Sequence, residues 1–432
     1  MKILIINYRY YESGGAERYM FNVTSLLERH GHTVIPFSLR FRMNRPSPYE
    51  KYFADPPGND DGNFYYKNLK KDVVSVLSLL GRQFYSKHVY NRLTNLIRDE
   101  KPDIAYVFHF LHKMSPSVID ACYDQKIPVV VRVSDFGLIC PKNSFYRDNA
   151  VCEKCQTNLW NSVKYNCVKD SKTASLVNYA AYQYNYARGF QKKISAIVSP
   201  SEFTITRFRQ SRYFQNMPFH HIPTFVNSVL LDYGMKRKPP NLMKIIYWGR
   251  ISFEKGIQSL LWAMKQLKDE GFEANLELIG DGEKIYIDEI SRLVTQLQLS
   301  RVTHIPFMEK EALFNRVKDA DVAVVPSVWY ENMPNSLLEA QALGIPVIVS
   351  DIGSLTELIQ DGRNGFLFKP GDSQSLADAF KKFFDKPERH RDMCRNSYQW
   401  AVDHYSAETH YQKLMDCFDS IKRKYCDEKC PI

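Results

Sequence analysis

The stretch Asp321–Asp351, DVAVVPSVWYENMPNSLLEAQALGIPVIVSD, holds two apolar runs separated by a helix-forming segment. Both runs, VAVV and PVIV, are rich in valine and isoleucine, which favours buried strands. The segment between them, SLLEAQALG, has helical composition and ends in a glycine. A strand, a helix and a second strand in this order predict a parallel βαβ unit.

The same alternation extends over the chain of 432 residues. In the first half, helical patterns alternate with the strand-like runs KILIIN, TVIPFSL, DIAYVFH, PVVVRVSD and ISAIVSPS. In the second half the further runs are KIIYWGR, ANLELIGDG, RVTHIPF and GFLFKP. Such runs are typical of doubly wound sheets covered on both faces. The sequence predicts two α/β domains, at 1–222 and 223–406, with a Pro-rich join in 219–242 and a helical tail at 407–432.

The composition is that of a globular protein, with 44% hydrophobic and 25% charged residues. No apolar run reaches the roughly 18–20 residues of a membrane span. The start MKILIINYRY lacks a small-residue cleavage site, so we expect a cytoplasmic protein.

Residues 1–222 hold 31 Lys and Arg against 18 Asp and Glu, whereas the remainder holds 27 against 30. This basic half predicts an anionic partner, such as phospholipid, lipid-linked pyrophosphate or nucleic acid, unless it is only a solvated surface.

Ligands of open α/β sheets bind at the carboxyl ends of strands, and two such domains offer the cleft between them. Loops that follow strands of the second half contain Arg250, Lys255, Gly280 and Phe307. The two cations suit a diphosphate because they donate charge-assisted hydrogen bonds, although surface Arg and Lys are common. Aromatic residues that could stack on a base are Tyr247, Trp248, Phe307 and Trp329.

The stretch ENMPNSLLEA places two carboxylates around a predicted helix start. The first residues at that helix start are expected to be Pro334, Asn335, Ser336 and Leu337. The N–H groups of a helix start stabilise a phosphate. Glu339, about one turn deeper, could accept hydrogen bonds from ribose hydroxyls, and Glu331 could face the sugar. The pattern predicts a nucleotide-sugar site with the pyrophosphate near Arg250 and Lys255, although either glutamate could instead be a solvated or capping residue.

The segments GRISFEKG, LIGDGE and WYENMPNSLLEAQALGIPVIVSDIGSLTELIQDGRNGFLFKPGD together resemble glycosyltransferase family 4, a large retaining group with the GT-B fold. Glu331 and Glu339, separated by seven residues, match the hallmark of that family. The resemblance implies two Rossmann-like domains facing a central cleft, with the donor on the C-terminal domain and a final helix that returns to the N-terminal domain. It also implies an N-terminal acceptor domain, with a glycan or polyprenyl-linked acceptor.

The resemblance assigns residues in the first half as well. Gly15 in ESGGAERYM matches a loop that reaches the donor phosphates and the acceptor. His109 matches a histidine that contacts the donor sugar, with His112 as the neighbouring alternative, and either could be structural. Related enzymes often have His-Asp where this chain has Ser134-Asp135. Asp135 is therefore a candidate cleft residue near the acceptor.

The predicted catalytic residues are His109, Asp135, Arg250, Lys255 and Glu331. Because no carboxylate is an obvious covalent nucleophile, we expect retaining front-face substitution in which the leaving phosphate takes the acceptor's proton. Arg250 and Lys255 would stabilise the charge on the departing diphosphate. No Asp-x-Asp motif has a suitable context, so we expect no catalytic cofactor and transfer without a metal.

Four of the nine cysteines are regularly placed, at Cys140, Cys152, Cys155 and Cys167. Eleven residues separate each outer cysteine from the central pair. In a cytoplasmic protein this arrangement indicates a metal rather than disulfides. Four thiolates with no open position predict a structural zinc that pins the insertion 140–167, with an iron–sulfur cluster or unliganded thiols as alternatives.

Residues 63–93, NFYYKNLKKDVVSVLSLLGRQFYSKHVYNRL, are basic, aromatic and helical in period. They predict peripheral contact with an anionic membrane at its inner face, or only a packed helix with a basic outer side. No basic-aromatic nucleic-acid module is evident, so we expect no nucleic-acid partner.

The leading hypothesis is a retaining hexosyltransferase of cell-surface polysaccharide or glycoconjugate synthesis. A catalytically inactive nucleotide- or glycan-binding scaffold is the alternative, suggested by Ser134.

Overall fold

A computed structural model of the chain describes residues 1–56, 81–226, 230, 243–385 and 387–429. The chain forms two compact units. The first unit comprises Met1–Phe145, Glu153–Ile222 and Tyr411–Ile432, and the second comprises Tyr146–Cys152 and Pro223–His410. Among the described helices, none combines the length and apolar character that a membrane crossing requires.

The first unit is built on a parallel sheet of six strands with the order β2-β1-β3-β4-β7-β8. Its strands are β1 (Lys2–Ile6), β2 (Thr33–Phe37), β3 (Ile104–Val107), β4 (Val129–Arg132), β7 (Ala196–Ser199) and β8 (Phe219–His221). The four residues of β3, of β4 and of β7 are all buried, as in a sheet that helices cover on both faces.

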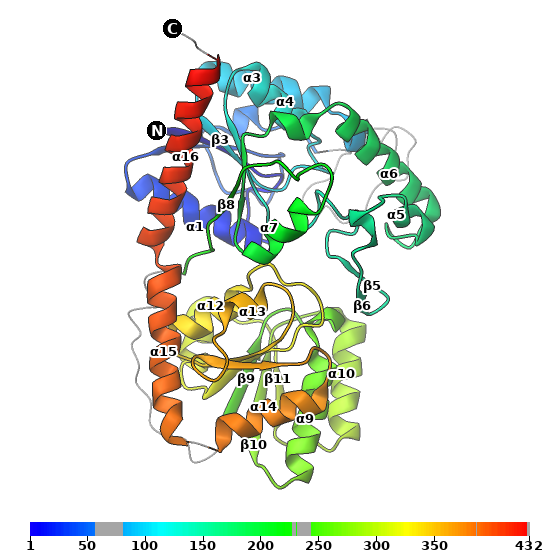
Figure 1. Cartoon of the computed structure of the whole chain (residues 1–432), viewed down its shortest axis with the longest axis vertical. Coiled ribbons are helices and arrows are strands. Elements are labelled where there is room, and N and C mark those ends of the chain that lie inside the picture. The colour runs from blue at the N-terminus through cyan, green and yellow to red at the C-terminus, as the bar shows by residue number, and fades with distance from the viewer. Residues whose placement is uncertain (57–80, 227–229, 231–242, 386, 430–432) are drawn as a thin grey trace. The chain divides into compact units, whose positions relative to one another are not determined.

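Three of the helices that accompany this sheet start at a serine that caps them. Ser86, Ser171 and Ser201 each accept a hydrogen bond from the backbone N–H three residues later, which stabilises the starts of α3, α6 and α7. The described helices of this part are α1 (Gly15–Arg29), η1 (Glu50–Tyr52), α3 (Lys87–Glu100), α4 (Ser117–Asp124), η2 (Lys154–Gln156), α5 (Asn161–Lys164), α6 (Lys172–Ala187), η3 (Phe190–Lys193) and α7 (Glu202–Arg209) (Figure 1).

The last helix, α16 (Ala407–Lys429), contributes its part from Tyr411 onward to the first unit. Phe418 is fully buried, and its ring centroid lies 5.4 Å from that of Tyr106 in β3. The Lys422 Nζ lies 2.8 Å from Asp103 Oδ1, just before the same strand. Side chains near the C-terminus of the chain thus complete the core of the first unit.

The second unit has a parallel sheet with the order β11-β10-β9-β12-β13-β14. Its strands are β9 (Met243–Trp248), β10 (Ala274–Ile279), β11 (Val302–Ile305), β12 (Val322–Val325), β13 (Val347–Ser350) and β14 (Gly365–Phe368). The direction in which the strand order grows reverses between β9 and β12. This reversal is the topological switch point at which open α/β sheets bind ligands.

Helices cover both faces of the second sheet (Figure 1). They are η4 (Phe253–Lys255), α9 (Ile257–Asp269), α10 (Lys284–Gln296), α11 (Lys310–Val317), α12 (Asn335–Ala342), α13 (Leu355–Leu358), α14 (Ser373–Phe384) and α15 (Pro387–Tyr405). A short antiparallel hairpin, β5 (Tyr146–Arg147) and β6 (Ala150–Val151), lies within the cysteine-rich insertion.

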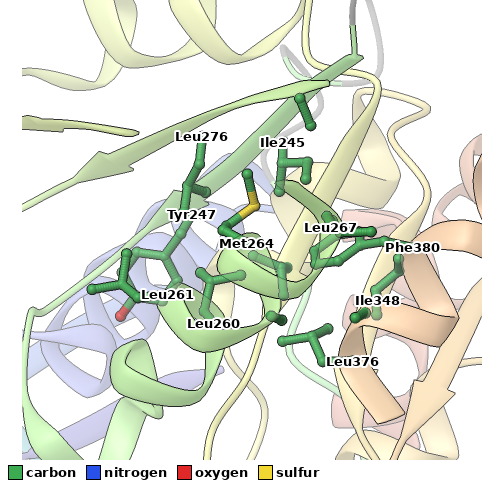
Figure 2. Packing of buried hydrophobic residues seen from close by; sticks show 14 of the residues in the cluster. Ile245, Tyr247, Leu260, Leu261, Met264, Leu267, Leu276, Ile348, Leu376 and Phe380 are labelled. Atoms are coloured by element: carbon green, nitrogen blue, oxygen red, sulfur yellow. The ribbon is translucent and has the colours of Figure 1, made fainter. Parts of the chain in front are cut away.

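Alternation along β9 divides the core of the second unit into two clusters. Ile245 and Tyr247 point to the face covered by α9 and α14, where Figure 2 shows them packed near Leu260 and Phe380. Ile246 and Trp248 belong to the cluster on the other face, which includes the buried side chains of α12. Because successive strand residues alternate, this register brings Trp248 to the helix that carries Glu339.

The prediction of two parallel α/β sheets is confirmed, and each predicted strand run contains a strand of the structure. The short strand β8 and the hairpin β5–β6 were not predicted. The basic segment predicted to contact a membrane, residues 63–93, lies largely outside the described residues, which resume at 81.

Candidate active site

The candidate donor site lies in the second unit, where two loops leave the carboxyl ends of adjacent strands. Arg250 and Lys255 follow β9, and Glu331 follows β12. β9 and β12 are hydrogen-bonded neighbours on either side of the switch point. Fold topology therefore brings together residues that are about 80 positions apart in the sequence.

Glu331 is the centre of this cluster and is only 7% exposed. Its Oε1 accepts hydrogen bonds from Lys255 Nζ at 2.6 Å, Ser327 Oγ at 2.6 Å and Trp329 Nε1 at 2.9 Å. Its backbone carbonyl accepts a further bond from Ser354 Oγ at 2.5 Å. Both the carboxylate and the backbone of Glu331 are thus fixed in position.

The charge on Glu331 follows from these contacts. Burial alone would raise the pKa of this carboxyl, but the Lys255 ammonium and the donors on Oε1 outweigh burial and hold the pKa below its ordinary value of 4.5. Glu331 is therefore a carboxylate at neutral pH. It can accept hydrogen bonds from hydroxyl groups, but it cannot donate a proton.

Arg250 lies at the outer part of the same loop, with a side chain that is 60% exposed. Its Nη2 is 2.6 Å from Glu254 Oε1, which also accepts a bond from Ser252 Oγ at 2.8 Å. The Tyr247 hydroxyl donates to the carbonyl of Arg250 at 2.6 Å and anchors the backbone. Lys255 and Arg250 each have a carboxylate partner, so a diphosphate here would share or replace those partners.

Glu339 lies on α12 and is 8% exposed. Its Oε2 accepts a hydrogen bond from the indole Nε1 of Trp248 at 3.0 Å. α12 begins at Asn335, and its preceding residue, Pro334, provides no side-chain cap. The side chain of Leu337 is fully buried in the core, so only its backbone can contact a ligand.

Two further predicted donor residues differ in what they do. Gly280 lies at the end of β10 with φ +139°, and a Cβ there would lie 2.0 Å from the Gly249 carbonyl oxygen, so it allows two loops to approach closely. Phe307 follows β11, and its side chain is 64% exposed. Of the other candidate stacking residues, Tyr247 and Trp248 are buried in the two cores.

The first unit has a cavity of about 200 Å³ at the carboxyl ends of β1, β3 and β4. His109 and Asp135 both line it, and His109 Nε2 lies 3.5 Å from Asp135 Oδ2. The backbone N–H of His109 donates to Asn7 Oδ1 at 3.2 Å. Gly15 is the first residue of α1, after the loop that leaves β1.

The alternative histidine, His112, also lines this cavity. Burial and the neighbouring Lys113 lower the pKa of His112 to about 4, so it is neutral at pH 7. Its Nε2 lies 3.4 Å from the Tyr182 hydroxyl. His112 thus has a structural partner on α6, whereas His109 has a carboxylate.

The four cysteines of the insertion are described, and no disulfide joins them. Cys140 is within electrostatic range of Cys167, and the Tyr182 hydroxyl is within range of both Cys140 and Cys155. Across the described parts of the chain, no three His, Cys, Asp or Glu side chains are placed as metal ligands. The structural zinc stays a prediction.

Sequence reasoning missed three contributors to the donor site. Ser327 and the indole N–H of Trp329 hold Glu331, and Glu254 pairs with Arg250. Serine and glutamate are too common in loops to be singled out from one sequence. Trp329 was noted only as a possible stacking residue, since its N–H partner depends on the path of its loop.

Two protein-family models cover most of the chain. Residues 13–229 match the model described as "Glycosyltransferase Family 4", and residues 235–400 match "Glycosyl transferases group 1". The chain therefore belongs to glycosyltransferase family 4. It has the GT-B fold, as the sequence resemblance predicted, and it is a glycosyltransferase.

The chain is also similar to three known proteins. The alpha-D-kanosaminyltransferase of Streptomyces kanamyceticus is 27% identical over 190 residues, 44% of this chain, so the chain spans about half of that relative's length (47%). The glycogen synthase of Mycobacterium tuberculosis is 22% identical over 420 residues, 95% of this chain and 92% of the relative. The structure of HepE from Anabaena in complex with UDP-glucose has a TM-score of 0.63 and 20% identity, covering 97% of this chain and all of HepE.

Proposed function

We propose that this glycosyltransferase transfers a sugar from a nucleotide-diphosphate sugar to a glycan or lipid-linked saccharide, with retention of configuration, in cell-surface polysaccharide or glycoconjugate synthesis. The observation that carries the proposal is the Lys255–Glu331 pair at the switch point of the second sheet. It combines a cation for a phosphate with a fixed carboxylate for sugar hydroxyls. The UDP-glucose complex of HepE, a protein of the same fold, supports a nucleotide-sugar donor.

In the proposed reaction the phosphates lie near Arg250 and Lys255. An ammonium group has three N–H donors, so Lys255 can keep Glu331 and also bind a phosphate oxygen. As the bond from the sugar to the leaving phosphate breaks, negative charge grows on that phosphate. Cations fixed in advance stabilise this charge in the transition state and so increase the rate.

Glu331 would hold the donor sugar, and Glu339 the ribose. Glu331 is ionised and has one oxygen that already accepts three hydrogen bonds, so it suits binding of hydroxyls better than nucleophilic attack. We therefore keep front-face substitution as the proposed route, in which the leaving phosphate removes the acceptor's proton. No step in this route requires a metal ion.

In the first unit, His109 and Asp135 would contact the sugar and the acceptor. Their side chains line one cavity, with 3.5 Å between His109 Nε2 and Asp135 Oδ2, and from this position Asp135 would orient the imidazole. Gly15 would bring the start of α1 close to the donor phosphates. These roles rest on the family resemblance together with the positions of the strands that carry the residues.

Donor binding is best tested by calorimetry with UDP, GDP, ADP and CDP, followed by transfer assays with the sugars of the base that binds. We expect one nucleotide to bind, and Lys255→Ala to lower the transfer rate roughly 100-fold or more. Product NMR should show the anomeric configuration of the donor. Activity should persist in EDTA. Failure of every nucleotide to bind the folded protein would overturn the donor proposal and favour the inactive scaffold.

Two finer proposals concern zinc and the membrane. A structural zinc on Cys140, Cys152, Cys155 and Cys167 predicts about one zinc per chain, lost when Cys152 and Cys155 are both changed to serine; a metal-free wild type would contradict it.

Peripheral membrane contact predicts that the full chain sediments with vesicles containing phosphatidylglycerol but not with phosphatidylcholine alone. Equal sedimentation with both would remove that proposal.

A further inference from the structure

Trp329 contacts both members of the Lys255–Glu331 pair. Its indole Nε1 donates to Glu331 Oε1 at 2.9 Å, and the Lys255 Nζ lies over its ring, 5.5 Å from the ring centroid. An ammonium group over the face of an indole is attracted by the negative charge density of that face. One half-buried side chain therefore contacts the cation and the carboxylate of the candidate donor site at the same time.

The side chains that donate to Glu331 come from two different loops. Ser327 and Trp329 are neutral, and they belong to the short stretch after β12 that also carries Glu331. Lys255 comes from the loop after β9. The two neutral donors would therefore keep Oε1 in place even when Lys255 turns towards a phosphate. A carboxylate that is fixed in advance loses less conformational entropy when a ligand binds.

The two carboxylate oxygens of Glu331 differ in their surroundings. Oε1 accepts the hydrogen bonds from Lys255, Ser327 and Trp329, whereas no described residue donates to Oε2. Oε2 is not one of the buried polar atoms that lack a partner, so it is accessible from outside. A carboxylate oxygen has two lone pairs, and those of Oε2 can accept hydrogen bonds from a ligand.

We propose that Trp329 is a positioning residue of the donor site, which holds Glu331 Oε1 with its N–H and Lys255 with its ring, and so reserves Oε2 for a hydroxyl of the donor sugar. This inference rests on the proposed function, because it takes Glu331 as the group that binds the sugar. It goes further because it assigns the oxygen that binds and the side chain that directs it.

The first test needs no ligand. NMR of the full chain with isotope-labelled glutamate follows the ionisation of Glu331 with pH, and the signal is assigned from its loss in Glu331→Gln. A hydrogen bond to the ionised form lowers the pKa of a carboxyl. Trp329→Phe keeps a ring beneath Lys255 but has no N–H, so the pKa of Glu331 should rise relative to wild type. Ser327→Ala, which removes the other neutral donor, should raise it as well.

The matched control is Trp400→Phe. Trp400 is also half-buried in the second unit, and its indole N–H donates to the Tyr405 hydroxyl at 2.8 Å. The substitution makes the same chemical change and should leave the pKa of Glu331 unchanged. An unchanged Glu331 pKa in folded Trp329→Phe, or an equal rise in Trp400→Phe, would overturn the proposal.

The other titratable groups that face Glu331, among the described residues, are Lys255 and Tyr247. Burial and the charge of Glu331 raise the pKa of Tyr247 well above its ordinary value, so its hydroxyl stays protonated in the acid titration. Lys255 keeps its bond to Oε1 in Trp329→Phe, and a change in the Glu331 pKa then reports the lost indole N–H.

A binding test separates the two contacts of Trp329. Calorimetry compares UDP with UDP-glucose, the donor in the HepE complex. Trp329→Phe should weaken UDP-glucose binding about tenfold, as for a lost hydrogen bond to a charged group, and change UDP binding by less than about twofold. Trp329→Leu, which also removes the ring beneath Lys255, should in addition weaken UDP binding about threefold.

These outcomes keep the inference apart from the donor proposal. If neither ligand binds the folded wild type, a uridine donor is overturned, and the NMR titration alone decides whether Trp329 positions Glu331. If both ligands bind and Trp329→Phe weakens neither, the inference is wrong although the donor proposal stands. Equal weakening of UDP and UDP-glucose in Trp329→Phe would mean that the indole acts on Lys255 alone, and it would overturn the assignment of Oε2.

Discussion

The Lys255–Glu331 pair is a buried ion pair of the second unit that also carries the proposed donor site. Each partner is largely buried, with side chains 19% and 9% exposed, and Glu331 has no second cation among the bonds described above. Lys255→Met should leave the carboxylate in place with only neutral donors. We expect the second unit to lose about 3 kcal/mol of unfolding free energy, as when one partner of a buried pair is removed.

The double variant Lys255→Met/Glu331→Gln should recover part of this loss, because no buried charge remains without its partner. Urea unfolding of the wild type, both single variants and the double variant measures the coupling. If the double variant loses the sum of the two single losses, the pair contributes no coupling energy.

The same pair gives the second unit a defined pH dependence. Lys255 and the other donors lower the pKa of Glu331 in the folded state below 4.5. The folded state therefore favours the ionised form of this carboxyl more than the unfolded chain does. Its contribution to stability is complete above about pH 4.5 and is lost as the pH falls through the lower, folded pKa. The unfolding free energy of wild type minus that of Glu331→Gln should be constant from pH 7 to 5 and shrink below 4.5. A difference that grows on acidification would contradict this assignment.

If the donor phosphates bind at Arg250 as proposed, Glu254 competes with them for its guanidinium. The pair is exposed on the arginine side, so it contributes little to stability. Glu254→Gln should free the guanidinium and tighten nucleoside-diphosphate binding about threefold, with unchanged unfolding free energy. The control is Glu273→Gln, which breaks the exposed Arg301–Glu273 pair at 3.1 Å in the same unit. Calorimetry that shows weaker binding in Glu254→Gln would mean that Glu254 positions Arg250 rather than competes for it.

At the scale of strands and loops, Gly280 lies where the loops after β9 and β10 approach each other most closely in backbone. A Cβ at Gly280 would lie 2.0 Å from a backbone oxygen, whereas one at Gly271 would meet nothing within 4 Å, although both residues have positive φ. Gly271→Ala should therefore cost only backbone strain, about 1 kcal/mol. Gly280→Ala should cost about 3 kcal/mol or more, because backbone must also move.

The two alanine variants also separate loop position from stability. Displacement of the loop after β9 should weaken nucleotide binding in Gly280→Ala but not in Gly271→Ala. Chemical unfolding and calorimetry on the same samples measure both effects. Equal effects of the two substitutions would show that strain alone matters at Gly280.

The sequence predicted elements well where periodicity and burial coincide. All six strands of the second sheet were recognised, either from apolar runs such as VAVV of β12 or from alternation such as ANLELI of β10. β8 was missed because it has only three residues, FHH, of which two are histidines and none is fully buried, at a sheet edge. The hairpin β5–β6 was missed because two-residue strands carry no periodicity.

The candidate site was predicted in part, for a related reason. Lys255 and Glu331 could be found because each follows a recognisable strand, but their 2.6 Å contact depends on β9 and β12 being neighbours. Strand order is a tertiary property that one sequence does not display. The prediction of Lys255 beside a diphosphate therefore did not include its carboxylate partner. Trp248, one of four residues considered for stacking on a base, is buried against Glu339.

At the scale of the whole molecule, the chain crosses from the second unit back to the first in α16. Because each unit has its own buried core, we expect the two units to respond separately to core substitutions. Phe418 of α16 and Phe380 of α14 are both fully buried, one in each unit. Removing either phenyl ring should cost about 3–4 kcal/mol, mostly through loss of buried apolar contacts and the cavity left behind.

The expected outcomes are opposite in the two units. Phe418→Ala should lower the unfolding midpoint of the first unit and leave nucleotide binding by the second unit unchanged. Phe380→Ala should lower the midpoint of the second unit and cause nucleotide binding to fail at lower denaturant concentrations. Far-ultraviolet circular dichroism reports total unfolding, and nucleotide binding at the same urea concentrations reports the second unit alone. If both variants shift both signals equally, the units unfold as one cooperative body, and the C-terminal helix couples them thermodynamically.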